Sequence, residues 1–377
     1  MINKICIAFI CGCLEESKDG VGDYTLIMAK QLALLGHIPI CIAINDRYIS
    51  CPPNSFPSVS SVGNIMVVRF GCKSSWLAKS LYIQKLIKKY NVSILSLQYV
   101  PYAFSSKGVP FGLLAWLPFI RNKTRWHIMC HELWVDGSLK TSNVILAFFQ
   151  KSVLIALLKL LNPVIIHTTN HYYQNSLHAC GFINSVLPLY SNISMVKTFP
   201  KLVKIPNRWV FIFFGSIHHE WNSDYFFSRL QNACINNNIT DCQLLLIGRS
   251  GQYGANLWSK LIHEYSRLSF RNLGECSQDE ISLQLQFADF GVTTTPSHLI
   301  EKSGTVAAML SHGLPVIITR VTTNDLEWNR KLKSLPEFVL FDPDFEKNLL
   351  SIAKYPPRQY SNSTAVEFLQ AIQQSFQ

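Results

Sequence analysis

Short apolar runs alternate with longer amphipathic stretches along this chain. Residues 4–12 and 38–44 are almost wholly apolar, and residues 24–35 between them carry apolar side chains at helical spacing. A short continuous apolar run is typical of a strand that is buried on both faces, as in a parallel sheet. The order strand, loop, helix, strand therefore predicts an α/β protein of the doubly wound type.

The same alternation continues towards the C-terminus. We predict further strands over 94–97, 125–130, 164–168, 209–214 and 243–247, helices over 76–89, 143–161, 172–180 and 224–236, and a loop over 50–61. Residues 195–208 lack periodicity and hold four Lys or Arg and two Pro, which indicates a domain boundary. We predict two Rossmann-like domains (1–195 and 209–359), a linker (196–208) and a C-terminal helix (360–377). The strand ends of both domains are expected to face a central cleft.

Residues 287–319 carry the most detailed pattern. A buried strand is predicted to end near Pro296, and a helix over 303–312 is followed by a second buried strand over 314–318. A carboxylate, an ammonium group, two hydroxyls and a glycine stand at the helix start, in the order Glu301, Lys302, Ser303, Gly304, Thr305. A helix N-terminus suits a phosphate, because its first N–H groups have no partners inside the helix and the helix dipole is positive there. An ordinary polar cap explains the same residues equally well.

Two other loops follow predicted strands and carry candidate chemistry. Gly20 and Gly22 come after the first strand and would let a ligand approach the backbone, although their spacing is not GxGxxG and a tight turn is an equal explanation. His131 and Glu132 follow the strand over 125–130. They are not part of an HExxH zinc motif, because position 135 is Val.

Composition narrows the partners. The 377-residue chain has a net charge of +11 and a pI of about 9.1, which favours an anionic partner such as a nucleotide phosphate, an acidic lipid or a nucleic acid. No helix-turn-helix, zinc-finger or RNA-recognition signature accompanies the charge, so no nucleic acid is expected. Eleven cysteines without a CxxC pair predict a reducing compartment, and the start of the chain is interpreted as a first strand rather than a signal peptide.

One predicted helix raises the question of a membrane. Residues 143–161 are nearly all apolar, with Lys151 and Lys159 roughly on one face, and residues 109–120 form a second apolar run. No run of about 18 apolar residues is free of charge, so we expect no membrane-spanning helix. A buried core helix is the default interpretation. We expect a cytoplasmic protein. The alternative to a core helix is a helix on an anionic membrane surface, which would make the protein peripheral on the inner membrane face.

Four blocks of the chain together resemble a known enzyme family. They are DGVGDYT at 19–25, HE at 131–132, FFGSI at 213–217, and TTPSHLIEKSG followed by HGLPVI over 294–317. In this order the chain resembles the GT-B glycosyltransferases, closest to the retaining family-4 (group 1) enzymes. The resemblance implies a nucleoside-diphosphate sugar donor on the C-terminal half and an acceptor on the N-terminal half. It also implies metal-independent transfer with retention at the anomeric carbon and no cofactor.

The resemblance also implies roles for individual residues. The catalytic set would be His131, Glu301 and Lys302, and the donor-binding set would be Gly20, Gly22, Gly215, Ser216, Arg249, Ser303, Gly304 and Thr305, with no metal ligand. Lys302 and the N–H groups of 303–305 would stabilise the leaving diphosphate, with Arg249 as a further cation. Glu301 would bind a sugar hydroxyl, and His131 would orient the sugar from the other domain.

The chain departs from the family pattern at two places. A second glutamate, which in the family binds the ribose, is replaced by Ala308 or Met309, depending on the alignment. The basic pair that often follows the glycine turn is replaced by His218, His219 and Glu220. Three alternatives therefore stay open: an inactive sugar-nucleotide-binding protein, a GT-B nucleotide-sugar epimerase, and a basic nucleic-acid binder. The acceptor is not defined by the sequence, and a lipid-linked or polysaccharide precursor is one candidate class.

Overall fold

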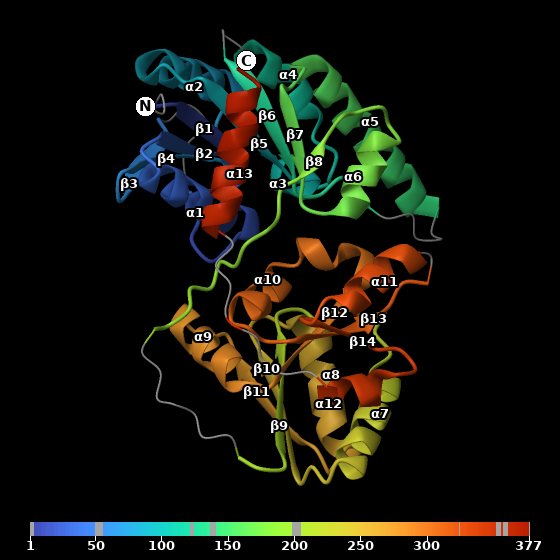
Figure 1. Ribbon diagram of the computed structural model, residues 1–377. Helices are drawn as coiled ribbons and strands as arrows, with labels where there is room; N and C mark the ends of the chain where they lie inside the picture. Colours follow the sequence, from blue (N-terminus) through green and yellow to red (C-terminus); the bar gives the residue numbers. More distant parts are fainter. Residues whose placement is uncertain are drawn as a thin grey trace. The chain divides into compact units, whose positions relative to one another are not determined.

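Two compact α/β units make up the protein (Figure 1). The structure is a computed structural model that describes residues 4–49, 56–120, 124–135, 141–197, 205–323, 325–351, 356 and 361–376. The first unit comprises Met1–Pro188 together with Ser361–Gln377, and the second comprises Leu189–Tyr360. Each unit is built on one mostly parallel sheet with helices packed on it, which confirms the predicted class of two Rossmann-like domains.

The sheet of the first unit has the order β3-β4-β2-β1-β5-β6-β7-β8. Its strands are β1 (Cys6–Cys11), β2 (Ile38–Asp46), β3 (Ser58–Val62), β4 (Ile65–Gly71), β5 (Ile94–Tyr99), β6 (Arg125–Cys130), β7 (Ile165–Thr168) and β8 (Ser185–Val186). Its helices are α1 (Gly20–Leu34), α2 (Trp76–Tyr90), α3 (Pro101–Phe104), α4 (Phe111–Ile120), α5 (Thr141–Leu161), α6 (His171–His178) and α13 (Ser361–Gln374). All neighbouring strands pair in parallel except β3 and β4. Every residue of β1 and β5 is buried, as the apolar runs predict.

The sheet of the second unit is parallel throughout, in the order β11-β10-β9-β12-β13-β14. Its strands are β9 (Arg208–Phe214), β10 (Asp241–Ile247), β11 (Ser269–Gly274), β12 (Phe290–Pro296), β13 (Val316–Arg320) and β14 (Phe338–Leu340). Its helices are α7 (Ser223–Asn236), α8 (Gly251–Glu264), α9 (Gln278–Phe287), the 3₁₀ helix η1 (Ser297–Lys302), α10 (Gly304–Ser311), α11 (Leu326–Ser334) and α12 (Phe345–Ser351). Strand order reverses direction between β9 and β12, which is the switch point of a doubly wound sheet.

The division between the units differs from the predicted one. The structure divides the chain after Pro188 rather than at residue 195, because the segment that follows packs on the second unit. Ile193 lies in a core cluster of the second unit, and Val196 N–H donates to the Ser282 hydroxyl on α9 at 3.0 Å. Part of the predicted linker, 198–204, lies outside the described residues.

Two further elements were not predicted where they lie. The C-terminal helix α13 packs on the first unit, where the Phe368 ring lies 6.0 Å from the ring of Phe9 on β1 and Arg125 donates to the Ser375 carbonyl. The second half of the predicted loop over 50–61 is the edge strand β3, which is fully exposed and therefore lacks the apolar signal of the inner strands. Residues 50–55 lie outside the described part.

Candidate functional site

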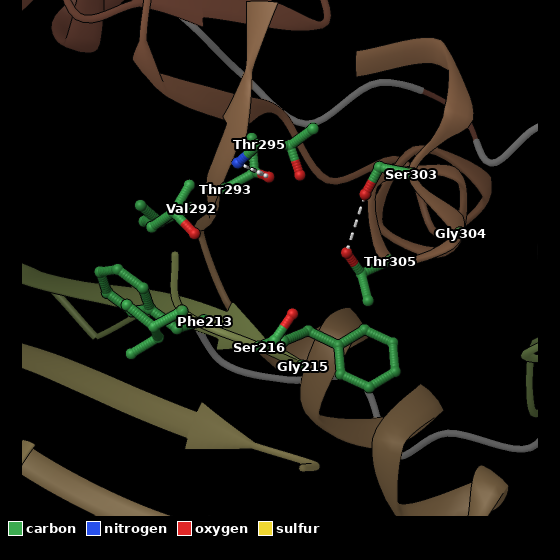
Figure 2. Close-up of a pocket in the computed structure, with 12 residues that line it drawn as sticks. Phe213, Gly215, Ser216, Val292, Thr293, Thr295, Ser303, Gly304 and Thr305 are labelled. Atoms are coloured by element: carbon green, nitrogen blue, oxygen red, sulfur yellow. Dashed lines mark hydrogen bonds between the residues drawn. The ribbon is translucent and has the colours of Figure 1, made fainter. Parts of the chain in front are cut away.

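A pocket of about 180 Å³ lies at the carboxyl ends of β9 and β12 in the second unit (Figure 2). It is lined by Phe213, Phe214, Gly215, Ser216, Ile217, Val292, Thr293, Thr294, Thr295, Ser303, Gly304 and Thr305. These two strands flank the switch point of the sheet, where the connections leaving them run to opposite sides. Ligands of open α/β sheets bind at this position, outside the carboxyl ends of the strands.

Gly215 forms the turn that leaves β9 and opens one wall of the pocket. Its φ is +85°, a left-handed conformation that costs other residues about 1–2 kcal/mol. A Cβ atom built on Gly215 would lie 3.0 Å from Cγ2 of Thr305, on the opposite wall. Gly215 N–H donates to the Ile247 carbonyl at 2.8 Å, which ties the turn to β10. The turn therefore requires glycine both for its backbone conformation and for its closeness to α10.

The first turn of α10 forms the opposite wall. Ser303 is the N-cap, and its hydroxyl accepts from Val306 N–H at 3.4 Å and hydrogen-bonds to the Thr305 hydroxyl at 3.1 Å. The N–H groups of Gly304 and Thr305 have no carbonyl four residues earlier within the helix. Figure 2 shows Ser303, Gly304 and Thr305 facing Ser216 across the pocket. This wall presents backbone donors at the positive end of a helix dipole.

No charged side chain is among the twelve residues that line the pocket, and half of them carry a hydroxyl group. Two of these hydroxyls already act on the backbone: Thr294 accepts from His218 N–H at 3.0 Å, and Thr293 accepts from Thr295 N–H at 3.2 Å. Hydroxyl groups and free N–H groups bind phosphate oxygens without a formal positive charge. A bound diphosphate would therefore draw its balancing charge from groups just outside the lining.

One cation at the carboxyl end of the sheet was not predicted from the sequence. Arg320, the last residue of β13, forms an ion pair with Glu220, and Glu220 belongs to the triplet that replaces the family's basic pair. Burial, together with the nearby positive charge of Arg320, lowers the pKa of His218 from its ordinary value. A cation at the last position of a buried parallel strand was the available signal, because the carboxyl ends of neighbouring strands meet at one edge of the sheet.

The structure brings together five of the predicted donor-binding residues. Gly215, Ser216, Ser303, Gly304 and Thr305 all line the pocket. Glu301 and Lys302 are the last two residues of η1 and immediately precede the Ser303 cap, but they are not in the lining. Arg249 is half exposed and forms an ion pair with Glu275 at 3.0 Å, also outside the lining.

The remaining predicted residues belong to the first unit. Gly20 is the first residue of α1 and has open space around it. Gly22 N–H donates to the N-cap Asp19 at 2.7 Å, and a Cβ on Gly22 would lie 2.5 Å from the Cys13 carbonyl oxygen. Gly22 is therefore required for packing of α1 on the preceding loop. His131, directly after β6, is 6% exposed and hydrogen-bonds through Nε2 to Gln98 at 2.9 Å.

The two candidate positions for the missing second glutamate are both in the core. Ala308 and Met309 are fully buried on the side of α10 that packs on the sheet. A Cβ on Gly291 of β12 would lie 2.4 Å from the Met309 sulfur, so this packing is tight. A carboxylate at either position would lose its solvation in this core. Within the described ranges, the side chains also form no group of three or more His, Cys, Asp or Glu that could hold a metal ion.

Comparison with known proteins gives a result at the level of fold. No protein-family model matches the chain, and no curated protein sequence matches it. Among solved structures, the catalytic domain of starch synthase IV from Arabidopsis thaliana, bound to ADP and acarbose, is 10% identical with a TM-score of 0.55 over 99% of each chain. The E. coli trehalose-6-phosphate structure bound with UDP-2-fluoro glucose is 10% identical with a TM-score of 0.59, over 98% of this chain and 96% of that one.

A third similar structure comes from a different reaction class. A Listeria monocytogenes protein assigned as a UDP-N-acetylglucosamine 2-epimerase is 12% identical with a TM-score of 0.55, over 99% of this chain and 97% of that one. At these identities the likeness concerns architecture and not activity. Both units are covered in every case, and the chain therefore has the GT-B fold.

Proposed function

We propose that this protein is a glycosyltransferase that moves a sugar from a nucleoside-diphosphate sugar to an acceptor. One observation carries the proposal: a hydroxyl-rich, uncharged pocket lies at the switch point of the second sheet, against the first turn of α10. The bound ADP and UDP-2-fluoro glucose named for two similar structures support the ligand class. The narrower proposal, a retaining enzyme of family 4 that needs no metal ion, rests on the sequence resemblance.

In the proposed reaction the donor diphosphate lies in this pocket. The N–H groups of Gly304 and Thr305 and the Ser216 hydroxyl bind its oxygens. As the bond between the anomeric carbon and the diphosphate oxygen breaks, negative charge grows on the leaving group, and Lys302 stabilises it together with the helix dipole. Glu301 accepts a hydrogen bond from a sugar hydroxyl, and His131 is proposed to bind a hydroxyl group of the substrate. The acceptor attacks from the face that the diphosphate leaves.

Nucleotide binding tests the pocket directly, and Gly215 offers a sharp variant. Titration calorimetry with ADP, UDP and GDP is expected to show binding of at least one of them to the native chain. Gly215→Ala should weaken that binding about tenfold. The alanine would add about 1–2 kcal/mol of backbone strain and a close contact between its Cβ atom and Thr305, and relief of both would displace the turn from the position that binds the nucleotide. Gly274→Ala is the matched control, since Gly274 also has a positive φ (+65°) but open space around it.

The proposal would be overturned if none of the three nucleotides bound, or if Gly215→Ala and Gly274→Ala weakened binding equally.

Two of the alternative functions share the pocket and need a different measurement. An inactive binder would bind nucleotide but neither transfer nor hydrolyse the sugar. An epimerase, the class named for the Listeria structure, would convert the nucleotide sugar in the absence of any acceptor, which product analysis by mass spectrometry detects.

The first unit also exposes an apolar surface, formed by α2, α4 and α5. The helix α4 packs against both α2 and α5. By length and composition α5 is apolar enough to cross a membrane, contrary to the sequence-based expectation. Only 33% of its most apolar 18-residue segment is buried inside the protein. Its second half packs inwards through residues such as Leu154 and Leu158, whereas Phe148 is 66% exposed. On α4, Phe119 is 73% exposed. A core helix would bury these side chains.

We propose that this surface rests on an anionic membrane on the cytoplasmic side. Positive charge on the same helices indicates that the membrane is anionic. The helix α2 carries Lys85, Lys88 and Lys89, and α5 carries Lys151 and Lys159. Lysines beside exposed aromatic side chains are typical of helices that lie in the interface of an anionic bilayer. A surface of this kind also suits a lipid-linked acceptor.

Vesicle co-sedimentation tests this surface. The full chain is expected to bind vesicles that contain phosphatidylglycerol and to bind pure phosphatidylcholine vesicles much less. Phe148→Ser should lower binding about tenfold, because burying one large apolar side chain contributes roughly 1.5–3 kcal/mol. Ile235→Ser, at a residue of similar exposure on α7 of the second unit, should leave binding unchanged. Equal partition onto both kinds of vesicle, or full binding by Phe148→Ser, would contradict the proposal.

A further inference from the structure

A continuous line of hydrogen-bonded polar side chains runs through the core of the first unit. His131 Nε2 lies 2.9 Å from Gln98 Oε1, and Gln98 Nε2 donates to the Ser96 hydroxyl at 2.7 Å. The Ser96 hydroxyl lies 2.7 Å from His127 Nδ1, and His127 Nε2 lies 3.0 Å from His167 Nδ1. Each of the five side chains is buried.

The strand pattern explains how five polar groups meet in an apolar core. Side chains two residues apart lie on the same face of a strand, so Ser96 and Gln98 share a face of β5. His127 and His131 share a face of β6 and its continuation, and β6 lies between β5 and β7. His127 pairs in register with Ser96 across the sheet. The neighbouring strands β5, β6 and β7 therefore present one polar row on a single face.

The bonds of this row depend on one another. Each neutral imidazole has one nitrogen that donates and one that accepts, and a hydroxyl can donate only one hydrogen. The Ser96 oxygen accepts from Gln98, and among the described residues His127 Nδ1 is the one acceptor that hydrogen-bonds to the Ser96 hydroxyl, so the Ser96 hydrogen is assigned to that nitrogen. His127 must then carry its hydrogen on Nε2 and donate it to His167. At the other end, Gln98 presents its carbonyl oxygen to His131 Nε2, which must donate.

The two ends of the row lie in different surroundings. At the inner end, the Phe368 ring of α13 packs edge-on against the His127 ring at 5.0 Å and also approaches the ring of His167. At the outer end, His131 stands after the last residue of β6, with the edge of the Tyr24 ring of α1 against it at 4.8 Å. Among the residues that the structure describes, none hydrogen-bonds to Nδ1 of His131. That nitrogen is left as the acceptor of the row.

We propose that Ser96, Gln98, His127 and His167 are positioning residues that hold His131 neutral, with its hydrogen on Nε2 and its Nδ1 turned to a substrate hydroxyl. Burial supports this, since it keeps all three imidazoles uncharged: it lowers the pKa of His131 to about 3 and that of His167 to about 4, and it lowers the pKa of His127 as well. The substrate contact rests on the proposed function. The single tautomer does not, and it is measured without any ligand.

Nitrogen NMR on the full chain with ¹⁵N-labelled histidine tests the row. All three imidazoles are expected as neutral rings protonated on Nε2, and a coupling through the hydrogen bond should join His127 Nε2 to His167 Nδ1. His37 is an internal reference, because its Nδ1 accepts from Ile5 N–H at 3.2 Å and so fixes its tautomer independently. His131→Gln assigns the signals of His131. Protonation of His131 on Nδ1, or no coupling between His127 and His167, would overturn the proposal, and no variant beyond the one used for assignment is needed to observe either result.

Cutting the row in the middle tests whether its members act on His131. In Ser96→Ala the two halves are no longer linked, so His131 should fall from one tautomer to a mixture of about half of each. Ser96→Thr keeps the hydroxyl and should restore the single tautomer. A single unchanged tautomer in Ser96→Ala would show that the row does not set it. Nucleotide affinity should stay the same in both variants, because the pocket is in the other unit. If the native chain bound no nucleotide, the proposed function would be overturned, whereas the conclusion from the NMR measurement would not change.

Discussion

Lys302→Ala is expected to lower the turnover of sugar transfer by about 10²–10³-fold, with the fold intact. That is the loss seen when one donor to a developing negative charge is removed from a comparable site, roughly 3–4 kcal/mol. The expectation follows from the pocket itself, whose lining holds no charged residue. A helix N-terminus supplies only about half a positive charge, which is less than a leaving diphosphate requires. Lys302 is the cation that directly precedes the Ser303 cap of this helix.

Saturating donor separates this effect from simple loss of binding. Under that condition a residue that acts on the leaving group lowers kcat, whereas a residue that only binds the ground state raises KM. Lys260→Ala is the matched control, because Lys260 lies on α8 of the same unit, exposed and paired with Asp224 and Glu264. Arg249→Ala tests the other predicted cation, which lies outside the pocket lining.

The competing account treats Lys302 and Glu301 as a solvated pair at the helix cap. A pair of that kind contributes roughly 0.2–1 kcal/mol to stability and nothing to the chemistry. Lys302→Ala would then keep near-normal turnover at saturating donor, and the catalytic assignment of this stretch would be wrong. If Arg249→Ala lost as much as Lys302→Ala, the charge would be shared between them. Glu301→Gln distinguishes further, since a lost sugar contact lowers turnover about a hundredfold while a lost cap pair does not.

Much of the fold could be predicted because its strands are buried on both faces. A wholly buried strand such as β5 has a continuous apolar run, and the turn residues around it mark its ends. The pocket could be predicted in part for the same reason. The Gly215 turn and the Ser303 cap are local features, and each depends on backbone geometry that only a few residue types support.

Features that depend on distant contacts could not be predicted. Nothing in the sequence of α13 states that it returns to the first unit, because the contact between Phe368 and Phe9 joins opposite ends of the chain. The edge strand β3 is exposed throughout, so no apolar period marks it. Arg320 is also distant in sequence from its partner Glu220, 100 residues away. The contacts of such residues can be recognised only when the order of the strands in the sheet is known.

The buried row of polar side chains has a sequence signal, but the dominant apolar pattern of the strands makes it hard to recognise. Ser96, Gln98, His127 and His167 lie within strands that are mostly apolar, and the polar positions within β5 lie two apart. A single polar residue in such a strand is compatible with many roles. Only the parallel pairing of β5, β6 and β7 brings them onto one line.

The first unit is expected to lose most of its stability between pH 6.5 and pH 5. Burial places the pKa of His131 at about 3 and that of His167 at about 4, and holds the pKa of His127 well below its ordinary value of 6.5. In the unfolded chain the same rings titrate near 6.5. Between these values the unfolded state binds protons that the folded state does not, so stability falls as pH falls and is fully present above pH 6.5.

The size of this effect is large for one domain. At pH 5 each ring that stays neutral in the fold, 1.5 pH units below its unfolded pKa, costs about 2 kcal/mol. Three rings together cost about 6 kcal/mol, which is comparable with the 5–15 kcal/mol that holds a typical domain folded. Hydrogen exchange followed by mass spectrometry separates the units, since peptides from β5, β6 and β7 report on the first sheet and peptides from β9 and β12 on the second.

A non-titrating ring substitute identifies the cause. In His167→Gln the amide can still accept from His127, but one proton-binding site of the unfolded chain is gone. The slope of stability against pH should therefore fall by about 1.4 kcal/mol per pH unit, the contribution of one proton, because the slope counts the protons taken up on unfolding. His178→Gln is the control, since His178 on α6 is exposed and lies outside the row. If the opening free energy of β5 to β7 stayed constant from pH 7 to pH 5, the three rings would already be charged or solvated in the fold. The neutral row of hydrogen bonds would then not exist, because a charged imidazole donates from both nitrogens and cannot accept the hydrogen of its neighbour.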